Sequence, residues 1–322
     1  MVRDNRTIRI ATRGSELALW QSHFVESSLR AVDSAVATEI VVVKTIGDRV
    51  QDVPLAQIGD RGLFTKEVDD AVLEGRADLA VHSLKDVPTV IQEGLEIVAV
   101  AERADPRDVL LCRPDGPESL DALASGSRVG TSSLRRRAQL MARRTDLEIV
   151  DLRGNLNTRL RRLDEGDYDA IILAAAGVLR LGWSERVSEY LDPPGWLPAV
   201  GQGALALLAR TNDEETRSLV SPLSHDATFH CTAAERAFLH ALEGGCQVPI
   251  AALATLDGER LHLDGLVSDL DGGQVVRDQL SGRADTAVEL GQELADRLIA
   301  LGAKDILRQV RMIGNAYPTP AP

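Results

Sequence analysis

A cysteine in a glycine turn is the residue of this sequence best placed for reactive chemistry. Cys246 lies in the run Glu-Gly-Gly-Cys-Gln-Val-Pro (243–249), just after an amphipathic segment. An exposed thiol beside the backbone N–H groups of a turn is favoured as the thiolate, which is the nucleophilic form. Cys112 and Cys231 differ, because the first falls in an apolar strand-like run and the second in a helix-like run. The pattern therefore indicates that Cys246 anchors a bound group.

Arginine and hydroxyl residues recur where strand-like runs pass into helix-like runs. The start of a helix presents free N–H groups and the positive end of its dipole, so anions bind there readily. The guanidinium group adds a planar fork that grips a carboxylate with two parallel hydrogen bonds. These junctions predict a site for several carboxylates, with the candidates Arg13, Ser15, Thr131, Ser132, Ser133, Arg135, Arg136, Arg153, Arg159 and Arg180.

A solvated helix surface is the ordinary position of a single arginine, and this alternative fits Arg137, Arg143, Arg144, Arg161 and Arg162 better. A nucleic-acid site in the run 134–144 is a second alternative. The run lacks interleaved aromatic residues and the chain carries a net charge of −13, so nucleic acid is not an expected partner.

Asp86 follows Lys85 in the run AVHSLKDVP, just beyond an apolar strand and before a proline. A carboxylate there could hold an N–H-bearing ligand and stabilise a developing positive charge. The alternative is a surface ion pair between Lys85 and Asp86, which would stabilise the protein little. His82 in the same run fits a packed histidine better than a catalyst.

Composition bounds the class of protein. The 322 residues favour two or three domains, and no CxxC or HxxxH pair offers preformed zinc ligands. No apolar run approaches the roughly 20 residues that span a bilayer, and the first ten residues lack the apolar stretch of a signal peptide. The three irregularly spaced cysteines do not form a disulfide framework. We expect a cytoplasmic protein with reduced thiols and no membrane partner.

Strand-like and helix-like runs alternate through the first two-thirds of the chain, which predicts α/β sheets with crossover helices. Ser15 can cap the first helix. Residues 9–21 match residues 128–139 as a strand, a Ser/Thr loop and a helix, and residues 65–81 match residues 158–172 as a helix, a glycine stop and a strand. We therefore predict two similar lobes, and residues 199–210 returning to the first lobe. The run 39–43 reads as a buried strand.

The last third has a different pattern. A helix over 228–242 leads to Cys246, Asp-Gly steps in 256–259 and 270–273 indicate hairpins, and a final helix is expected over 287–301 before a disordered tail. The predicted domains are a first α/β lobe (1–103 plus 200–221), a second α/β lobe (104–199) and a C-terminal α+β domain (222–322).

Taken together, these stretches resemble the porphobilinogen deaminase (hydroxymethylbilane synthase) family from residue 9 to about residue 250. The runs that carry the resemblance are RIATRGSELALWQ, GLFTKEVDDAVLEGRADLAVHSLKDVP, AERADPRD, VGTSSLRRRAQL, LRGNLNTRL, YDAIILAAAGVLRLG, LPAVGQGA and LEGGCQVPI. The resemblance implies a transferase of tetrapyrrole biosynthesis that joins four porphobilinogen molecules head to tail, with loss of ammonia, to linear hydroxymethylbilane. It also implies two lobes like those of type II periplasmic binding proteins, with a third domain presenting Cys246.

By this resemblance, Cys246 carries a dipyrromethane cofactor through a thioether, and Asp86 is the catalytic aspartate. Asp86 would accept hydrogen bonds from pyrrole N–H groups and stabilise the cation formed as ammonia departs. The residues matching cofactor contacts are Ser83, Lys85, Thr131, Ser132, Ser133, Arg135 and Arg136. Those matching substrate contacts, chiefly to its carboxylates, are Arg13, Ser15, Phe64, Arg153, Arg159 and Arg180. Arg61 stands where many relatives carry lysine, so the charge is kept while its reach and geometry change.

Porphobilinogen is thus the expected partner, bound to a monomer. The rival function is a non-enzymatic receptor for a polycarboxylate in a two-lobed cleft. Such a receptor needs the arginines and the helix starts, but it needs neither Asp86 nor Cys246.

Overall fold

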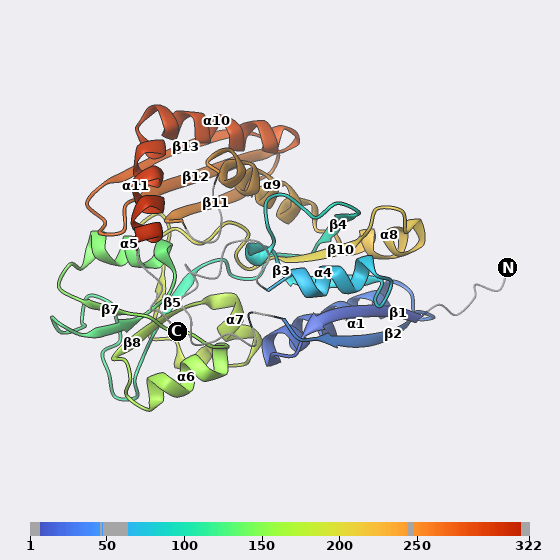
Figure 1. The fold of residues 1–322 in the computed structure, drawn as a ribbon, viewed down its shortest axis with the longest axis horizontal. Helices are drawn as coiled ribbons and strands as arrows, with labels where there is room; N and C mark the ends of the chain where they lie inside the picture. Colours follow the sequence, from blue (N-terminus) through green and yellow to red (C-terminus); the bar gives the residue numbers. More distant parts are fainter. Residues whose placement is uncertain (1–6, 46, 48–63, 244–247, 317–322) are drawn as a thin grey trace. The chain divides into compact units, whose positions relative to one another are not determined.

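The computed structural model describes residues 7–45, 47, 64–243 and 248–316, which form three β-sheets with their helices (Figure 1). The described residues divide into two compact units. The first unit contains residues 7–45, 47, 64–104 and 203–229, and the second contains residues 105–202, 230–243 and 248–316.

The first unit is built on a five-stranded sheet of order β2-β1-β3-β10-β4. Its strands are β1 (Thr7–Arg13), β2 (Ala37–Val43), β3 (Leu79–Ser83), β4 (Leu95–Val100) and β10 (Leu205–Arg210). Strand β1 runs parallel to β2 and β3, whereas β10 runs antiparallel to β3 and β4. The helices of this unit are α1 (Glu16–Val32), α4 (Lys66–Leu73) and α8 (Glu214–Val220).

The second unit contains a five-stranded sheet of order β7-β6-β8-β5-β9. Its strands are β5 (Asp108–Cys112), β6 (Arg128–Gly130), β7 (Glu148–Val150), β8 (Ala170–Ala174) and β9 (Glu189–Leu191). Strand β6 runs parallel to β7 and β8, whereas β5 runs antiparallel to β8 and β9. The helices beside it are α5 (Leu134–Arg143), α6 (Leu156–Asp164) and α7 (Ala175–Arg180).

The two sheets have the same topology. In each sheet, three parallel strands lie beside an antiparallel strand, which is β10 in the first lobe and β5 in the second. Along the chain, β10 comes directly after β9 of the second lobe, and β5 comes directly after β4 of the first lobe. The prediction that residues 199–210 return to the first lobe is therefore confirmed. The fold class is also confirmed, as two similar α/β lobes and a smaller C-terminal α+β domain.

One detail repeats between the lobes and explains their common sequence pattern. Asp78, just before β3, accepts a hydrogen bond from the backbone N–H of Arg9 in β1 (3.0 Å). Asp169, just before β8, accepts one from the backbone N–H of Arg128 in β6 (2.8 Å). Each aspartate follows a glycine at positive φ, Gly75 and Gly166, that ends the preceding helix. The matched Glu-Gly-x-x-Asp spacing thus sets the register of the third strand against the first in both lobes.

Strand β2 corrects one prediction. The apolar run 39–43 was expected to be buried, but β2 is an edge strand with only β1 as neighbour, and Val42 is 55% exposed. An apolar run identifies a strand, whereas its place in the sheet depends on the tertiary fold.

The C-terminal region is an antiparallel meander covered by helices. Its strands are β11 (Ile250–Asp257), β12 (Arg260–Ser268) and β13 (Val275–Arg283), and its helices are α9 (Asp226–Ala241), α10 (Ala287–Ala300) and α11 (Ala303–Ala316). Both hairpins predicted at Asp-Gly steps are present, with Gly258 and Gly272 at positive φ. The helix expected over 287–301 is not the last, because Gly302 ends α10 and α11 follows.

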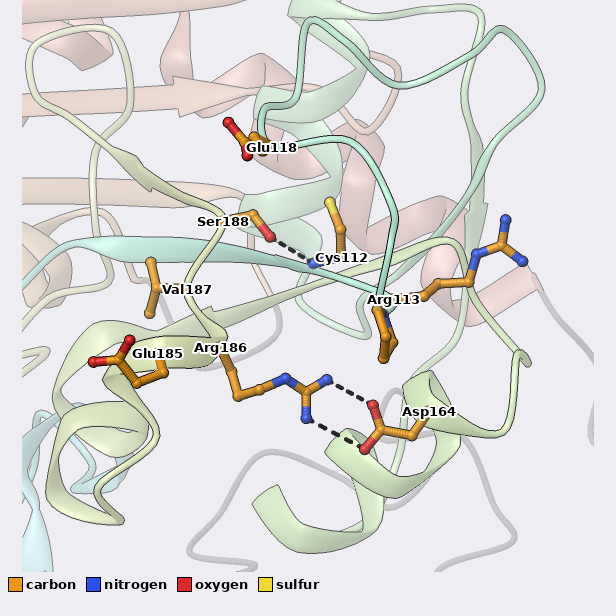
Figure 2. A pocket seen from close by; sticks show the side chains of 9 residues that line it. Cys112, Arg113, Glu118, Asp164, Glu185, Arg186, Val187 and Ser188 are labelled. Carbon is orange, nitrogen blue, oxygen red and sulfur yellow. Dashed lines mark hydrogen bonds and ion pairs between the residues drawn. The ribbon is translucent and has the colours of Figure 1, made fainter.

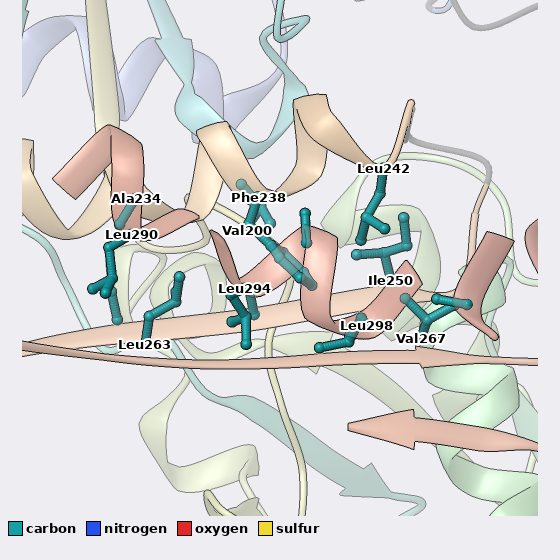
Figure 3. Close-up of a cluster of buried hydrophobic side chains, with 14 of the residues drawn as sticks. Val200, Ala234, Phe238, Leu242, Ile250, Leu263, Val267, Leu290, Leu294 and Leu298 are labelled. Carbon is teal, nitrogen blue, oxygen red and sulfur yellow. The ribbon is translucent and has the colours of Figure 1, made fainter. Parts of the chain in front are cut away.

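Figure 3 shows the core of this region, where α9 and α10 pack on the meander. The ring of Phe238 lies against Gly265 of β12, where a Cβ atom would come within 2.7 Å of it. Gly291 of α10 lies against the backbone of α9 at Ala234. These two glycines allow α9, the helix that precedes the Cys246 run, to seat closely against the sheet and α10. The three-domain boundaries given above stay a prediction.

Candidate functional site

In the first lobe, the end of β3 carries the predicted carboxylate. The chain leaves β3 at Ser83 and forms a short 3₁₀ turn, Leu84–Asp86. The Ser83 hydroxyl accepts a hydrogen bond from Nε2 of Gln21 in α1 (2.9 Å), which fixes the strand end against that helix. Lys85 and Asp86 are both half-buried. Within the described part of the chain, no group hydrogen-bonds to the Asp86 carboxylate or forms an ion pair with it.

The bare carboxylate of Asp86 bears on the two alternatives for this residue. A surface ion pair with Lys85 is not formed. A half-buried carboxylate without a protein partner loses hydration and gains nothing in return, so it is a favourable place for a ligand that donates N–H groups. Behind it, His82 is buried and its Nε2 lies 2.8 Å from Oδ1 of buried Asp69, as expected of a packed histidine.

The end of β1 supplies a cation and a helix cap. Ser15 is the N-cap of α1 and accepts a hydrogen bond from the N–H of Ala18 (3.3 Å), which confirms the predicted cap. The guanidinium carbon of Arg13 lies 4.5 Å from the ring centroid of Phe64, so the cation stacks on the aromatic face. This contact brings together two residues that lie far apart in the sequence.

In the second lobe, the hydroxyls after β6 order the loop into α5. Ser133 caps α5 by accepting from the N–H of Arg136 (3.4 Å), and Thr131 Oγ1 accepts from the N–H of Ser133 (3.2 Å). Ser132 Oγ donates to the carbonyl of Leu152 (2.8 Å) and accepts from its N–H (3.1 Å). These contacts fix the loop on β7; contacts of the three hydroxyls with a cofactor stay a prediction.

Arg135 and Arg136 are not on the surface but buried, about a common carboxylate. Asp108, fully buried at the start of β5, accepts from Arg135 Nη1 (2.7 Å) and from Arg136 Nη2 (2.7 Å) and Nε (3.1 Å). Trp196 Nε1 (2.7 Å) and Gln202 Nε2 (3.0 Å) donate to the same carboxylate. Burial would raise the pKa of Asp108, but the two guanidinium groups outweigh it and hold that pKa far below its usual range.

The buried group holds two cations and one anion, so one positive charge is left over. Nη1 of Arg135 also donates to the carbonyl of Leu197 (2.8 Å), and Nη1 of Arg136 donates to the carbonyl of Ile172 (2.8 Å). Among the described residues, none pairs with Nε or Nη2 of Arg135. The remaining edge of this guanidinium is therefore suited to a ligand carboxylate, which would also balance the excess charge.

The three other predicted arginines follow the second and third parallel strands of this lobe. Arg153 lies half-buried after β7, and Arg159 in the first turns of α6 donates from Nε to the carbonyl of Gly154 (2.8 Å). Arg180 ends α7, which begins directly after β8, and burial lowers its pKa to about 10. A nearby anion would favour its charged form again. All three lie on connections that leave the carboxyl ends of the parallel strands.

Sequence reasoning missed Asp108 and Arg236. Asp108 stands in the run AERADPRD, but nothing local pairs it with arginines 27 and 28 residues away. A usable signal was the Leu-Arg-Arg-Arg run itself, because two arginines on a buried helix face require an anion. Arg236 lies in α9, and burial lowers its pKa to about 10, as it does for Arg180.

A separate hollow of about 600 Å³ lies near the opposite end of β5 from Asp108 (Figure 2). Its lining includes Cys112, and Arg186 reaches across to pair with Asp164 (2.6 Å). Burial raises the pKa of the Cys112 thiol and so disfavours its thiolate, as expected of a packed strand residue.

Cys246 and Arg61 lie outside the described residues. The described chain reaches Glu243, two residues past the end of α9, and resumes at Val248. Within the described ranges, no helix is long and apolar enough to cross a membrane. The same ranges hold no group of three or more His, Cys, Asp or Glu side chains that could bind a metal ion.

Known proteins similar to this chain give a consistent result. Residues 8–218 match the family model for the porphobilinogen deaminase dipyromethane cofactor binding domain, and residues 229–300 match the porphobilinogen deaminase C-terminal domain. Porphobilinogen deaminases from Pelobacter propionicus and Trichlorobacter lovleyi are each 50% identical over 305 residues, which cover 95% of this chain and 97% of theirs. The solved periplasmic VFT2 domain of Bordetella pertussis BvgS covers 67% of this chain and 86% of its own at 17% identity and TM-score 0.42.

Proposed function

The chain belongs to the porphobilinogen deaminase family, and from this premise we propose that it joins four porphobilinogen molecules head to tail, with loss of ammonia, to give linear hydroxymethylbilane. This is the transferase activity of hydroxymethylbilane synthase, a step of tetrapyrrole biosynthesis. The observation that carries the proposal beyond family membership is the half-buried Asp86 carboxylate, which has no partner among the described residues.

Asp86 has the chemistry that the reaction requires. When ammonia leaves porphobilinogen, positive charge develops over the pyrrole ring and its exocyclic methylene. A carboxylate that accepts the ring N–H stabilises this charge more than it stabilises the neutral substrate, and only such a difference lowers the barrier. Because no cation among the described residues pairs with Asp86, its carboxylate can accept from the substrate without a competing ion pair there.

The residues fit the family's dipyrromethane cofactor, whose pyrroles carry acetate and propionate groups. When bound, this group supplies the pyrrole carbon to which the first substrate is joined. We propose that Cys246 holds it covalently. The free edge of Arg135 and the excess charge of the Asp108 group suit one of its carboxylates, whereas Lys85, Ser83, Thr131, Ser132, Ser133 and Arg136 are the other proposed contacts or supports.

Substrate carboxylates are assigned to the cations that follow the parallel strands. Arg13 is held on the ring of Phe64, so its guanidinium is already ordered before ligand binds. Arg180 is buried enough to have its pKa lowered to about 10, so an incoming carboxylate would be bound in a poorly hydrated place, where ion pairs are strong. Ser15, Arg153 and Arg159 complete the proposed set.

Two broader features of the protein are also proposed, from the sequence. The net charge of −13 and the lack of a heptad pattern favour a monomer, and three irregularly spaced cysteines, which suit reduced thiols, favour the cytoplasm. Light scattering of the eluted protein tests the first proposal, since a mass near twice 34.7 kDa would contradict it.

Turnover of porphobilinogen separates this enzyme from a polycarboxylate receptor. Purified protein is incubated with porphobilinogen, the product is oxidised in acid, and uroporphyrin is measured by its absorbance. The proposal predicts uroporphyrin in proportion to protein and time, and its loss in Cys246→Ala. A protein that binds porphobilinogen but yields no uroporphyrin would support the receptor instead.

A further inference from the structure

Arg311 of α11 contacts the turn that follows α9, the helix before Cys246. Helix α9 ends at Ala241, and Leu242 and Glu243 follow in a turn. The carbonyl groups of these two residues lie beyond the helix, so its ladder of hydrogen bonds gives them no partner. Arg311 of α11 supplies one, because its Nη2 lies 2.7 Å from the carbonyl oxygen of Glu243 and 3.5 Å from that of Leu242. Its Nη1 lies 3.4 Å from the Glu243 carboxylate.

Glu243 has a backbone conformation that requires support. Its φ of +52° lies in the left-handed region, which residues with a Cβ atom adopt only at a cost. Its N–H donates to the carbonyl of His240 (2.9 Å), which fixes one side of the peptide. Arg311 binds the carbonyl and the carboxylate of the same residue, so it fixes the other side and the side chain together.

Arg311 is held in place by the packing of its own helix. Leu307 and Val310 of α11 are almost fully buried, and Leu307 packs in the same apolar cluster as Leu242. Beside them, a hollow of about 300 Å³ borders both the turn and α11. Apolar packing between α11 and the turn is incomplete at this hollow. In the described part of the chain, Arg311 therefore links the two by polar contacts.

We propose that Arg311 is a positioning residue for the cofactor cysteine. By fixing Glu243 in its left-handed conformation, it sets the direction in which the chain leaves α9, three residues before Cys246. This inference depends on the proposed attachment at Cys246. It also gives a role to α11, which begins after residue 300, where the match to the family's C-terminal domain ends.

The reaction to be measured is the attachment itself. The Cys246 sulfur forms a bond with the exocyclic methylene carbon of porphobilinogen, the carbon–nitrogen bond breaks, and the amine leaves as ammonia with the thiol proton. The protein is produced without cofactor in a host unable to make porphobilinogen, porphobilinogen is added, and intact-mass spectrometry follows the gain in mass with time.

The matched control lies one turn earlier on the same helix. Arg308 is also exposed, and it pairs with Asp305 within α11 rather than with the turn. We expect Arg311→Ala to slow attachment about tenfold, the effect of losing a charge-assisted contact. Arg308→Ala should attach cofactor at the wild-type rate. Arg311→Lys should recover part of the rate, because an ammonium group can reach one acceptor but lacks the guanidinium fork.

Hydrogen exchange gives a second readout that does not depend on the cofactor. Arg311→Ala should speed exchange of the amides of Leu242 and Glu243, whereas Arg308→Ala should not. Wild-type attachment in Arg311→Ala, or equal slowing in Arg308→Ala, would overturn the proposal. A Cys246→Ala protein that still gained the mass would contradict attachment at Cys246 and would overturn the positioning role of Arg311 with it. Slow attachment caused by Arg311→Ala alone would leave the proposed function intact.

Discussion

The two lobes share one topology but use different strand ends for chemistry. In the first lobe, the connection after β3 carries Ser83, Lys85 and the carboxylate of Asp86, which has no partner in the described part of the chain. In the second lobe, the matching connection after β8 carries the small residues Ala175, Ala176 and Gly177. The second lobe places its charges after β6 instead, where Arg135 and Arg136 surround buried Asp108.

On the proposed function, this difference divides one task between two copies of a scaffold. The carboxylate of Asp86 would stabilise the positive charge that develops as ammonia departs. The buried group with one excess positive charge would hold carboxylates of the bound polyanion. The same βα junction supplies both, because its helix start and strand end are available whichever side chains occupy them.

The largest effect is expected from Asp108→Asn in the second lobe. Asparagine leaves Arg135 and Arg136 buried without an anion, and breaking such a pair costs about 3–5 kcal/mol of the free energy of unfolding. Denaturant unfolding measures this cost. Asp86→Asn is the control from the first lobe, and it should change stability by less than about 0.5 kcal/mol, because Asp86 has no partner to lose among the residues that the structure describes. Equal destabilisation by both substitutions would remove the contrast between the lobes.

The loss of stability caused by Asp108→Asn should depend on pH. The guanidinium groups hold the pKa of Asp108 below its unfolded value of about 3.9. A carboxyl group whose pKa falls on folding adds stability above its unfolded pKa and loses it as the pH falls through the folded pKa. The difference in stability between wild type and Asp108→Asn should therefore be constant from about pH 5 to 8 and shrink below about pH 4. A difference that grew on acidification would contradict the assignment.

Asp86→Asn should have the next largest effect, on turnover rather than on stability. Removing one group that stabilises charge in the transition state typically costs about 10²–10³ in rate. Steady-state formation of uroporphyrin measures the loss, and intact mass shows whether the cofactor is still attached. Retention of near-normal turnover would exclude Asp86 from catalysis.

The caps of the two equivalent helices provide a smaller and symmetrical test. Ser15→Ala in the first lobe and Ser133→Ala in the second each remove a side-chain acceptor from a helix start, at a cost of about 1 kcal/mol. Thermal unfolding of the two variants should give similar shifts. Turnover should fall no further than the loss of stability explains in a variant whose hydroxyl only caps its helix. A larger fall in turnover would indicate that the hydroxyl also contacts a ligand.

Phe64→Leu is expected to have the smallest effect. It removes the aromatic face under Arg13, an interaction of about 0.5–1 kcal/mol at a partly exposed site. The apparent affinity for porphobilinogen should fall a few-fold while kcat changes less, because Arg13 stays present but less ordered. Phe64→Tyr keeps the ring and should behave like wild type.

The sequence predicted the repeated topology because the same short pattern occurs twice. The Glu-Gly-x-x-Asp run before β3 recurs before β8, so the repeat is visible although Asp78 and Asp169 accept hydrogen bonds from residues 69 and 41 positions away. Asp108 could not be found in this way, because it meets its arginines only when β5 enters a sheet formed by later strands. Helix α11 could have been predicted from the sequence, because Ile306, Leu307 and Val310 have helical spacing and are buried on one face.

The central claim is that this chain builds its product on a group held by Cys246, and intact-mass spectrometry tests it most directly. Wild-type protein purified from cells that make porphobilinogen should be heavier than its sequence by one dipyrromethane, and Cys246→Ala purified in parallel should match its sequence mass. A wild-type protein at its bare sequence mass that nevertheless forms uroporphyrin would contradict the account.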